Sequence, residues 1–414
     1  MKHIAFLFAY LACWLVATSA EAESPIQPGD RIAIVGNTFA DQLRIHGYLE
    51  TLLLQHTREN PVSIRNLGWG GDMLSARDRP TGFPSEETTL AAHKTDVIIA
   101  CFGMGESFAG DAGREEFKRQ IRSFLNSHAG KKYNDKTEVR VILVSPIACE
   151  DHGDLTPALD QRNDDLQSYA GAMREVASES KVTFIDLLEA SRYLMDETTG
   201  PKLTSNGIHL TAYGYWAISH SFFDQLTASD RASDQPRWLL RIDAATKSTD
   251  VRGVEIREIV SDDSGLRLLV AEKSAPRLRP PTDKPLPPQL AFVRDTLVIE
   301  SLQPGKYQLT IDGQPVATAT ARAWAKGVAV DASPAHRLAE AYHSVVNDKN
   351  LQFTYSWKAL NQVHIVGERR GSPSGRELPA EVIEFARLAR NLDQELGKGI
   401  ELKTREWRVS PVSD

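Results

Sequence analysis

Cysteine is scarce in this chain, with three residues among 414, and one of these, Cys13, lies in an N-terminal apolar run. The other two, Cys101 and Cys149, allow one disulfide at most. Cys101 lies in an apolar segment, where a buried free thiol is commoner than a disulfide. We therefore favour two free thiols, with one disulfide as the alternative.

An excess of basic charge is also missing. The chain has 48 Lys and Arg residues against 55 Asp and Glu residues, which gives a formal net charge of −7. A protein that holds nucleic acid or an anionic membrane surface by bulk electrostatics needs the opposite balance. We expect no nucleic-acid partner, and a small, neutral or non-acidic partner instead.

Glycine motifs that bind nucleotides are absent, because no Gly-x-Gly-x-x-Gly opens a helix and there is no Walker loop. The segment 149–154 (CEDHGD) contains possible metal ligands, but it lacks the paired spacing of a zinc or calcium site. We interpret it as a polar loop at the rim of a site. The sequence therefore implies no cofactor and no metal.

The apolar run near the N-terminus is short for a membrane span. It extends from residue 4 to about residue 17, whereas roughly 20 residues are needed to cross a bilayer. Lys2 and His3 precede it, and Ala20-Glu21-Ala22 has the small-x-small form of a signal-peptidase site. Residues 1–22 are thus predicted to be a signal peptide, with an uncleaved anchor as the alternative. We expect an exported protein, periplasmic or secreted, with no membrane span after cleavage.

The composition that remains is that of a folded protein, with 41% hydrophobic and 25% charged residues. Between residues 27 and 228, short apolar runs alternate with helix-length amphipathic ones. This alternation predicts a parallel sheet covered by helices on both faces, a three-layer α/β/α domain whose ligands bind beyond the carboxyl ends of the strands. The predicted strands are 31–36, 62–67, 96–102, 139–145 and 182–186, and the predicted helices include 39–57, 113–127 and 160–180.

Four segments at these strand ends carry the most informative residues. They are 36–39 (GNTF), 68–72 (GWGGD), 103–107 (GMGES) and, before the last helix, 205–210 (SNGIHL). Their order and placement resemble the SGNH (GDSL-type) hydrolase family over about residues 30 to 226. The resemblance implies a flavodoxin-like domain with a serine nucleophile, an oxyanion hole completed by a Gly and an Asn, and a late Asp-x-x-His that supplies the orienting acid and the base.

The resemblance assigns these roles with three departures. Thr38 stands at the nucleophile position, after Asn37, and Gly71 matches the oxyanion Gly. Gly105 occupies the place of the oxyanion Asn, and His209 matches the catalytic His but has Asn206 three residues before it in place of Asp. A threonine hydroxyl can still attack a carbonyl, but its methyl group crowds the approach. Asn206 can orient an imidazole but cannot stabilise an imidazolium.

The resemblance, together with the predicted export signal, implies an exported ester hydrolase that acts on acyl (acetyl) esters of a small-molecule or polysaccharide carbohydrate. The alternative is a catalytically silent protein of the same fold that binds glycan in the same cleft. The departures at positions 38, 105 and 206 are what keep this alternative open.

Several of the residues also have simpler readings. Thr38 could be the N-cap of the following helix, and His209 could be a helix-entry residue that packs against Trp216. Trp69 is either a core aromatic or a platform for a sugar ring. The glycines of these segments could serve tight turns alone, and the spare carboxylates Asp72 and Glu106 have no spacing that links them to His209.

Beyond residue 228 the pattern changes to two further parts. Residues 238–330 are predicted to form a small antiparallel β-rich accessory unit, interrupted by the proline-rich stretch 276–288 and including an Asp312-Gly313 hairpin turn. Residues 333–410 are predicted to be mainly helical. Within them, 351–366 resembles the C-terminal extension of large exported SGNH-type proteins of planctomycete-like bacteria.

Overall fold

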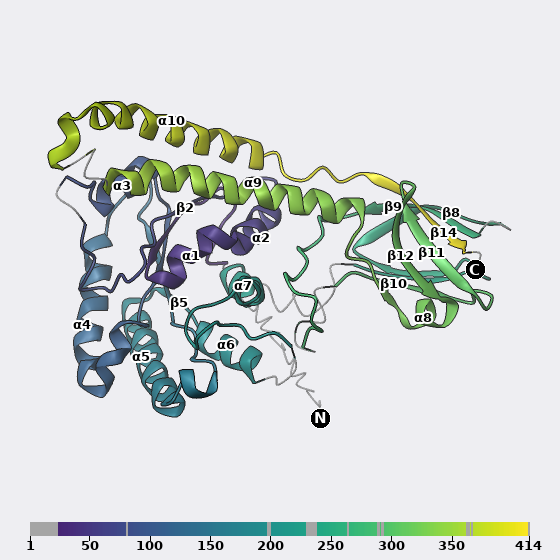
Figure 1. Ribbon diagram of the computed structural model, residues 1–414, viewed down its shortest axis with the longest axis horizontal. Helices are drawn as coiled ribbons and strands as arrows, with labels where there is room; N and C mark the ends of the chain where they lie inside the picture. The colour runs from purple at the N-terminus through teal and green to yellow at the C-terminus, as the bar shows by residue number, and fades with distance from the viewer. Residues whose placement is uncertain are drawn as a thin grey trace, which may run out of the picture.

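The computed structural model describes residues 24–79, 82–196, 200–228, 238–262, 265–287, 290, 294–361, 365 and 367–412. The predicted signal peptide lies outside these ranges. Figure 1 shows an α/β domain at one end and a β-rich unit at the other, joined by the long helix α9 (Pro334–Trp357).

The sheet of the α/β domain is parallel throughout, in the order β2-β1-β3-β4-β5. This flavodoxin-like order confirms the predicted fold, and it places the point where the strand order reverses between β1 and β3. The strands are β1 (Arg31–Gly36), β2 (Ser63–Asn66), β3 (Val97–Cys101), β4 (Arg140–Val144) and β5 (Thr183–Ile185).

Alternate side chains of β1 feed two hydrophobic cores, because successive residues of a strand point to opposite faces. Ile32 and Ile34 pack with α1, α2 and α7, whereas Ala33 and Val35 pack with α4 and α5. The helices of the domain are α1 (Thr38–His46), α2 (Tyr48–His56), α3 (Glu86–His93), α4 (Gly110–His128), α5 (Leu159–Ser180), α6 (Leu187–Met195) and α7 (Ala212–Leu226), with the 3-10 turns η1 (Glu106–Ala109) and η2 (Gly153–Leu155).

The single helix predicted over 39–57 is wrong, because the chain forms two helices that break at Gly47. This glycine has φ +57, and it ends α1 in the left-handed conformation. A Cβ here would lie 2.2 Å from Oδ1 of Asn347 on α9. The break therefore serves both the turn and the close approach of a distant helix.

The β-rich unit consists of two sheets and, contrary to the prediction, it is not antiparallel throughout. One has the order β13-β10-β6-β7, in which β10 and β6 are parallel, and the other, β12-β11-β14-β9-β8, is antiparallel. A core that includes Trp238, Trp324 and Trp407 lies among them. The elements are β6 (Leu239–Asp243), β7 (Thr249–Arg252), β8 (Val254–Asp262), β9 (Gly265–Glu272), β10 (Thr296–Glu300), β11 (Lys306–Ile311), β12 (Gln314–Thr320), α8 (Ala321–Lys326) and β13 (Val328–Ala329).

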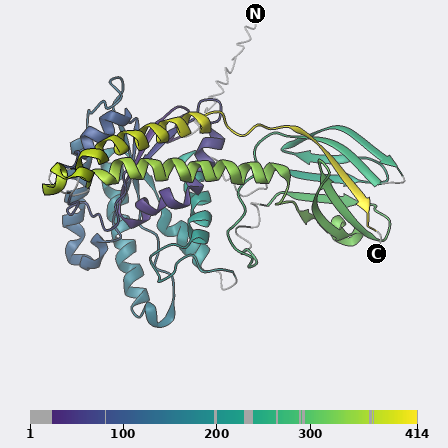
Figure 2. The same ribbon diagram turned by 45° about the horizontal axis from the view of Figure 1, so that its top comes forward.

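The C-terminal region links the two ends of the molecule. Helices α9 and α10 (Pro373–Leu396) run side by side over the α/β domain, as both ribbon views show (Figures 1 and 2). The strand β14 (Thr404–Pro411), which the sequence analysis did not predict, then returns to the β-rich unit between β11 and β9.

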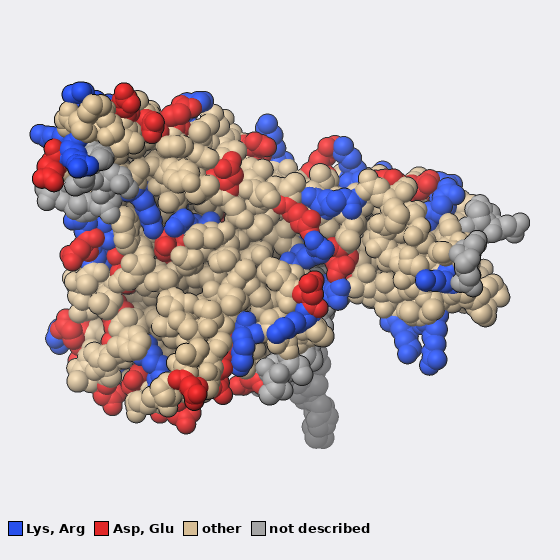
Figure 3. Space-filling model, in the orientation of Figure 1, with Lys and Arg blue, Asp and Glu red and all other residues tan. Residues whose placement is uncertain are grey.

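Three further properties of the described residues complete the description. No helix among the described residues has the length and apolar character to cross a membrane. Cys101 and Cys149 are both free and buried, as favoured from the sequence. On the face drawn in Figure 3, positive and negative side chains are intermixed over both ends of the molecule.

Candidate active site

Four of the five predicted site residues line one cavity. Thr38, Gly71, Gly105 and His209 come from four separate segments of the chain and line a cavity of about 180 Å³ at the carboxyl ends of β1, β3 and β4. The fifth, Asn206, contacts His209. The rest of the wall is mostly apolar and comprises Asn37, Phe39, Asp72, Met73, Cys101, Phe102, Met104, Ser145, Pro146, Ile147, Ile208 and Tyr215.

Thr38 is the first residue of α1, and its hydroxyl does not cap that helix. The N-cap is Asn37, whose side chain accepts a hydrogen bond from the backbone N of Phe39 at 3.0 Å. The Thr38 hydroxyl instead accepts the backbone N–H of Gly71 at 3.2 Å. The N-cap interpretation of Thr38 is therefore wrong, and the hydroxyl lies next to a backbone donor in the cavity.

Gly71 owes its identity to its backbone conformation. Its φ is +86, and a Cβ would meet no atom within 4 Å, so space does not select glycine here. The neighbouring Asp72 is buried and accepts hydrogen bonds from Arg79 at 2.7 and 3.0 Å. The Asp72 carboxylate thus holds its own loop rather than the imidazole.

Gly105 has an ordinary right-handed conformation with φ −70, so its backbone would accept a side chain. Space is the obstacle, because a Cβ at Gly105 would lie 2.9 Å from Cγ and 3.0 Å from Sδ of Met73. Glu106 accepts the backbone N–H groups of Gly103 at 2.8 Å and Leu74 at 2.9 Å, and burial raises the pKa of its carboxyl group. Met73 therefore fills the place where an oxyanion asparagine would begin.

His209 is exposed at the cavity and is held by Asn206. Its Nδ1 lies 3.1 Å from Oδ1 and 3.0 Å from Nδ2 of Asn206. Because Oδ1 also accepts the backbone N–H of His209 at 3.0 Å, it is placed to accept Nδ1–H as well, which leaves Nε2 free as a base. Trp216 stacks with Tyr213 and contacts His220, so it does not account for His209.

Two other potential nucleophiles, Ser145 and Cys101, line the cavity, but neither is available for attack. The Ser145 hydroxyl donates to the carbonyl of Pro146 at 3.0 Å and accepts the backbone N–H groups of Leu187 and Leu188 at 2.8 and 3.0 Å. Burial raises the pKa of the Cys101 thiol far above its ordinary value, so it does not ionise near neutral pH. Thr38 is left as the candidate.

Glu150 is a residue of the site region that the sequence analysis did not assign. It is buried in the loop after β4, and its carboxylate accepts N–H of Leu203 at 3.1 Å and both N–H and O–H of Thr204 at 2.7 Å. Thr204 in turn accepts the N–H of Gly207 at 3.1 Å, while Glu150 N–H donates to the Gly207 carbonyl at 2.9 Å. Glu150 thus fastens the turn that carries Asn206 and His209. Its place in the CEDHGD loop was the only sequence signal.

Trp69 packs as an aromatic of the protein rather than as a free platform. Its ring meets Trp357 and Phe83 edge to face, with centroids 5.7 and 5.9 Å apart. Arg79 and Lys358 lie 4.3 and 4.7 Å from the ring centroid as cation–π partners. These four neighbours favour the core interpretation over sugar stacking.

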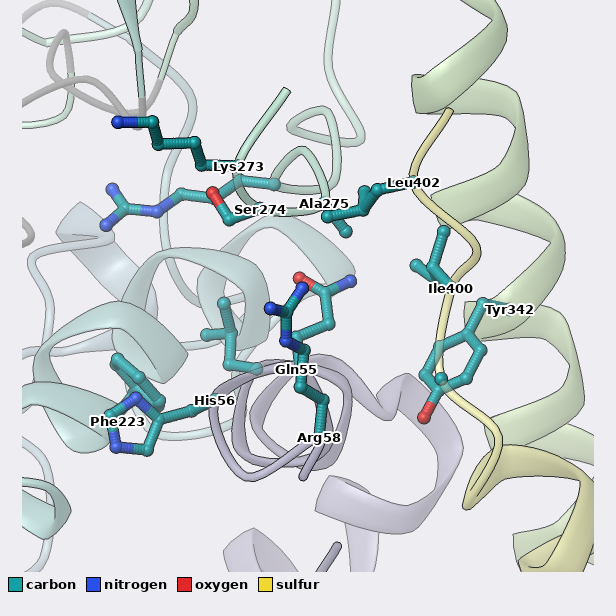
Figure 4. Close-up of a pocket in the computed structure, with 13 residues that line it drawn as sticks. Gln55, His56, Arg58, Phe223, Lys273, Ser274, Ala275, Tyr342, Ile400 and Leu402 are labelled. Carbon is teal, nitrogen blue, oxygen red and sulfur yellow. The ribbon is translucent and has the colours of Figure 1, made fainter. Parts of the chain in front are cut away.

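A second cavity, of about 470 Å³, lies away from these residues (Figure 4). Gln55 and Arg58, at the end of α2, face the segment of Ser274 and Ala275, and Tyr342 of α9 stands at the side. The chain runs from α2 into the amino end of β2, so this cavity lies toward the amino ends of the strands, away from the candidate active site. Nowhere in the described part of the chain do three His, Cys, Asp or Glu residues gather as metal ligands.

The fold is a three-layer α/β/α domain of flavodoxin-like strand order, and its cavity brings together a hydroxyl, an imidazole and backbone N–H donors. Residues 29–217 match the GDSL-like Lipase/Acylhydrolase family, a family of carboxylic-ester hydrolases. No curated protein matches the sequence.

Two solved structures are similar to the chain at low sequence identity. A gut microbial diltiazem-metabolizing enzyme is 16% identical with a TM-score of 0.67, and the match covers 94% of this chain and 99% of that one. An acetylxylan esterase from Geobacillus stearothermophilus is 18% identical with a TM-score of 0.38, over 49% of this chain and 96% of its own. The first of these matches shows that the fold of nearly the whole chain, accessory parts included, occurs elsewhere.

Proposed function

We propose that this protein is an exported esterase that removes short acyl groups, acetyl foremost, from carbohydrate. The observation that carries the proposal is the convergence of Thr38, Gly71 and His209 on one cavity, with the Thr38 hydroxyl free of the helix cap. A volume of about 180 Å³ with apolar walls suits a short acyl chain.

The proposed reaction is acyl transfer in two halves. The Thr38 oxygen attacks the ester carbonyl while Nε2 of His209 takes its proton, and the backbone N–H groups of residues 38 and 71 hold the oxyanion. His209 then returns the proton to the leaving alcohol, which leaves an acyl-threonine. Water repeats the sequence, releasing the carboxylic acid and restoring Thr38.

The test is turnover of an acetylated methyl xyloside and of p-nitrophenyl acetate by the full exported chain. Thr38→Val keeps the shape of the side chain and removes the hydroxyl, so we expect kcat/KM to fall at least about 100-fold, and likewise in His209→Ala. Thr38→Ser removes only the methyl group, and its activity should equal or exceed that of the parent.

Equal background rates in the parent, Thr38→Val and His209→Ala would reject the esterase. The silent glycan-binding protein would then stand, since Met73 already fills the place of one oxyanion donor. Glycan affinity that changes in His209→Ala without any change in hydrolysis would identify it.

Export is the second part of the proposal and rests on residues 1–22. We expect N-terminal sequencing of the mature protein to begin close to Glu23. Recovery of the chain with Met1 intact from a soluble cytoplasmic fraction would refute it.

A further inference from the structure

The cavity is too small to hold the alcohol part of an ester together with its acyl group. Sites that enclose a drug-sized ligand have volumes of about 300–1,000 Å³, whereas this cavity has about 180 Å³. A short acyl group and the carbonyl use this space. A ring-bearing alcohol therefore lies outside, over the rim.

The turns η1 and η2, which follow two strands whose ends reach the cavity, each carry an exposed apolar side chain. Strands β3 and β4 are parallel neighbours, so the turns that follow them, η1 and η2, lie above the same edge of the sheet. Phe108 on η1 is 67% exposed and Leu155 on η2 is 68% exposed. Of the two, Phe108 lies three residues after Gly105, which lines the cavity, so it is the candidate contact for the alcohol.

Phe108 is exposed and also firmly held. Cζ of Arg162 lies 3.7 Å from the centroid of its ring. Arg162 is itself fixed, because its Nη2 donates to the carbonyl of Met104 and to the hydroxyl of Ser107, both at 2.8 Å. Met104 and Gly105 belong to the cavity wall, and Phe108 N–H donates to the Gly105 carbonyl at 3.3 Å. The ring thus stands at a defined place relative to the reacting groups.

We infer that Phe108 is the stacking platform for the sugar ring of the alcohol, and hence a determinant of specificity. A pyranose presents a flat face of C–H groups that packs on an aromatic ring. The Arg162 guanidinium covers part of the Phe108 ring, and the rest of the ring is exposed and available to a ligand. This inference rests on the proposed esterase function and adds the alcohol half of its substrate.

The experiment compares two acetyl esters that differ only in the alcohol, an acetylated methyl xyloside and ethyl acetate. Phe108→Ala is expected to raise KM for the xyloside about three- to tenfold while kcat/KM for ethyl acetate stays unchanged. Phe108→Trp should restore the xyloside KM. Ile383→Ala is the matched control, since Ile383 is 69% exposed but lies on α10, and it should change neither ester.

Each outcome decides the inference separately from the esterase proposal. An unchanged xyloside KM in Phe108→Ala overturns the platform and leaves the esterase intact. A KM that rises for p-nitrophenyl acetate but not for the xyloside assigns the platform to aromatic alcohols and overturns the sugar. If the parent hydrolyses neither acetate, the esterase fails, and binding of acetylated xylo-oligosaccharide by calorimetry tests the platform: affinity lost in Phe108→Ala supports it, and equal or absent binding overturns it.

Discussion

At the scale of single residues, Asn206 is the departure with the clearest chemical consequence. Its amide is already placed on Nδ1 of His209, at 3.0 and 3.1 Å, so geometry is not what the site lacks. What it lacks is a negative charge to stabilise the imidazolium that forms when Thr38 gives up its proton.

Asn206→Asp is therefore expected to raise kcat/KM for p-nitrophenyl acetate by at least about tenfold, since the reverse change in a serine protease costs about 10⁴ in turnover. The gain should disappear when His209→Ala is added, because the new carboxylate acts only through that imidazole. A gain that persists without His209 would show that the carboxylate acts elsewhere.

Replacement of Gly105 raises a problem of space, because a side chain at this position would collide with Met73. A Cβ at this position would lie 2.9 Å from Cγ of Met73, which is an inner atom of that side chain rather than its flexible end. We expect Gly105→Asn alone to lower activity, and Gly105→Asn with Met73→Ala to raise kcat about tenfold or more over Met73→Ala by supplying an oxyanion donor. Parallel steady-state kinetics of the three variants would check this, and a Gly105→Asn variant at least as active as the parent would contradict the packing argument.

At the scale of elements, the turn from Leu203 to Leu210 depends on a group outside it. The turn closes on itself through an antiparallel bridge between Thr204 and Leu210 and through Ser205 N–H, which donates to the His209 carbonyl at 2.9 Å. Glu150 fastens it to the loop after β4 with three hydrogen bonds to Leu203 and Thr204. The position of the His209 imidazole therefore depends on the buried carboxylate of Glu150, which holds this turn in place.

Glu150→Gln is expected to lower kcat at least about tenfold with little change in KM, because one amide oxygen cannot accept the bonds that two carboxylate oxygens accept. Thr204→Val, which removes the hydroxyl alone, should show a smaller loss of the same kind. Steady-state kinetics on p-nitrophenyl acetate checks the split. A fall in thermal stability with kcat intact would make Glu150 structural only.

The elements of the α/β domain could be predicted because their signals are local. All five apolar runs form parallel strands, and the segments after four of them, β1 to β4, line one cavity, as the carboxyl-end rule requires. Gly47 was misread because a helical period of 3.6 residues carries no information about φ or about Asn347, 300 positions away. Three other features depend in the same way on residues far away in the sequence. They are the contacts of Glu150, the contact of Met73 with Gly105 and the pairing of β14 with β9.

At the scale of the whole molecule, α9 fastens the C-terminal region to the α/β domain. His343 of α9 stacks on Tyr48 of α2, with centroids 4.8 Å apart, and its Nδ1 lies 2.8 Å from the hydroxyl of Thr51. Burial, and secondarily His46, lower the pKa of His343 from 6.5 to about 4. The docked helix therefore holds a neutral imidazole.

This neutral histidine gives a pH dependence with a definite sign. Below pH 6.5 the unfolded chain binds a proton at His343 that the folded chain refuses, so the free energy of unfolding falls as the pH is lowered, until about pH 4. In His343→Gln the slope over this window should be smaller by up to about 1.4 kcal/mol per pH unit. Urea denaturation at several pH values checks it, and parallel slopes in parent and variant would contradict it.

A buried ion pair connects the same two parts more strongly. Nζ of Lys349, which is 0% exposed, donates to Oε1 of Glu50 at 2.5 Å and to the carbonyl of Ile64 at 3.0 Å. Asn350 donates to the other oxygen of Glu50 at 2.8 Å. The cation of α9 is thus enclosed between α2 and β2, and removal of either partner leaves the other charge buried without compensation.

Glu50→Gln and Lys349→Met should each lower the free energy of unfolding by about 3–5 kcal/mol, whereas the double variant should lose clearly less than the sum, because no unpaired charge remains. Glu384→Gln is the control, since it breaks an exposed pair with Arg387 on α10 and should leave the free energy of unfolding nearly unchanged. Urea denaturation followed by tryptophan fluorescence measures all four. Strict additivity of the two single losses would mean that Glu50 and Lys349 do not act as a pair, and that packing alone docks the C-terminal helices.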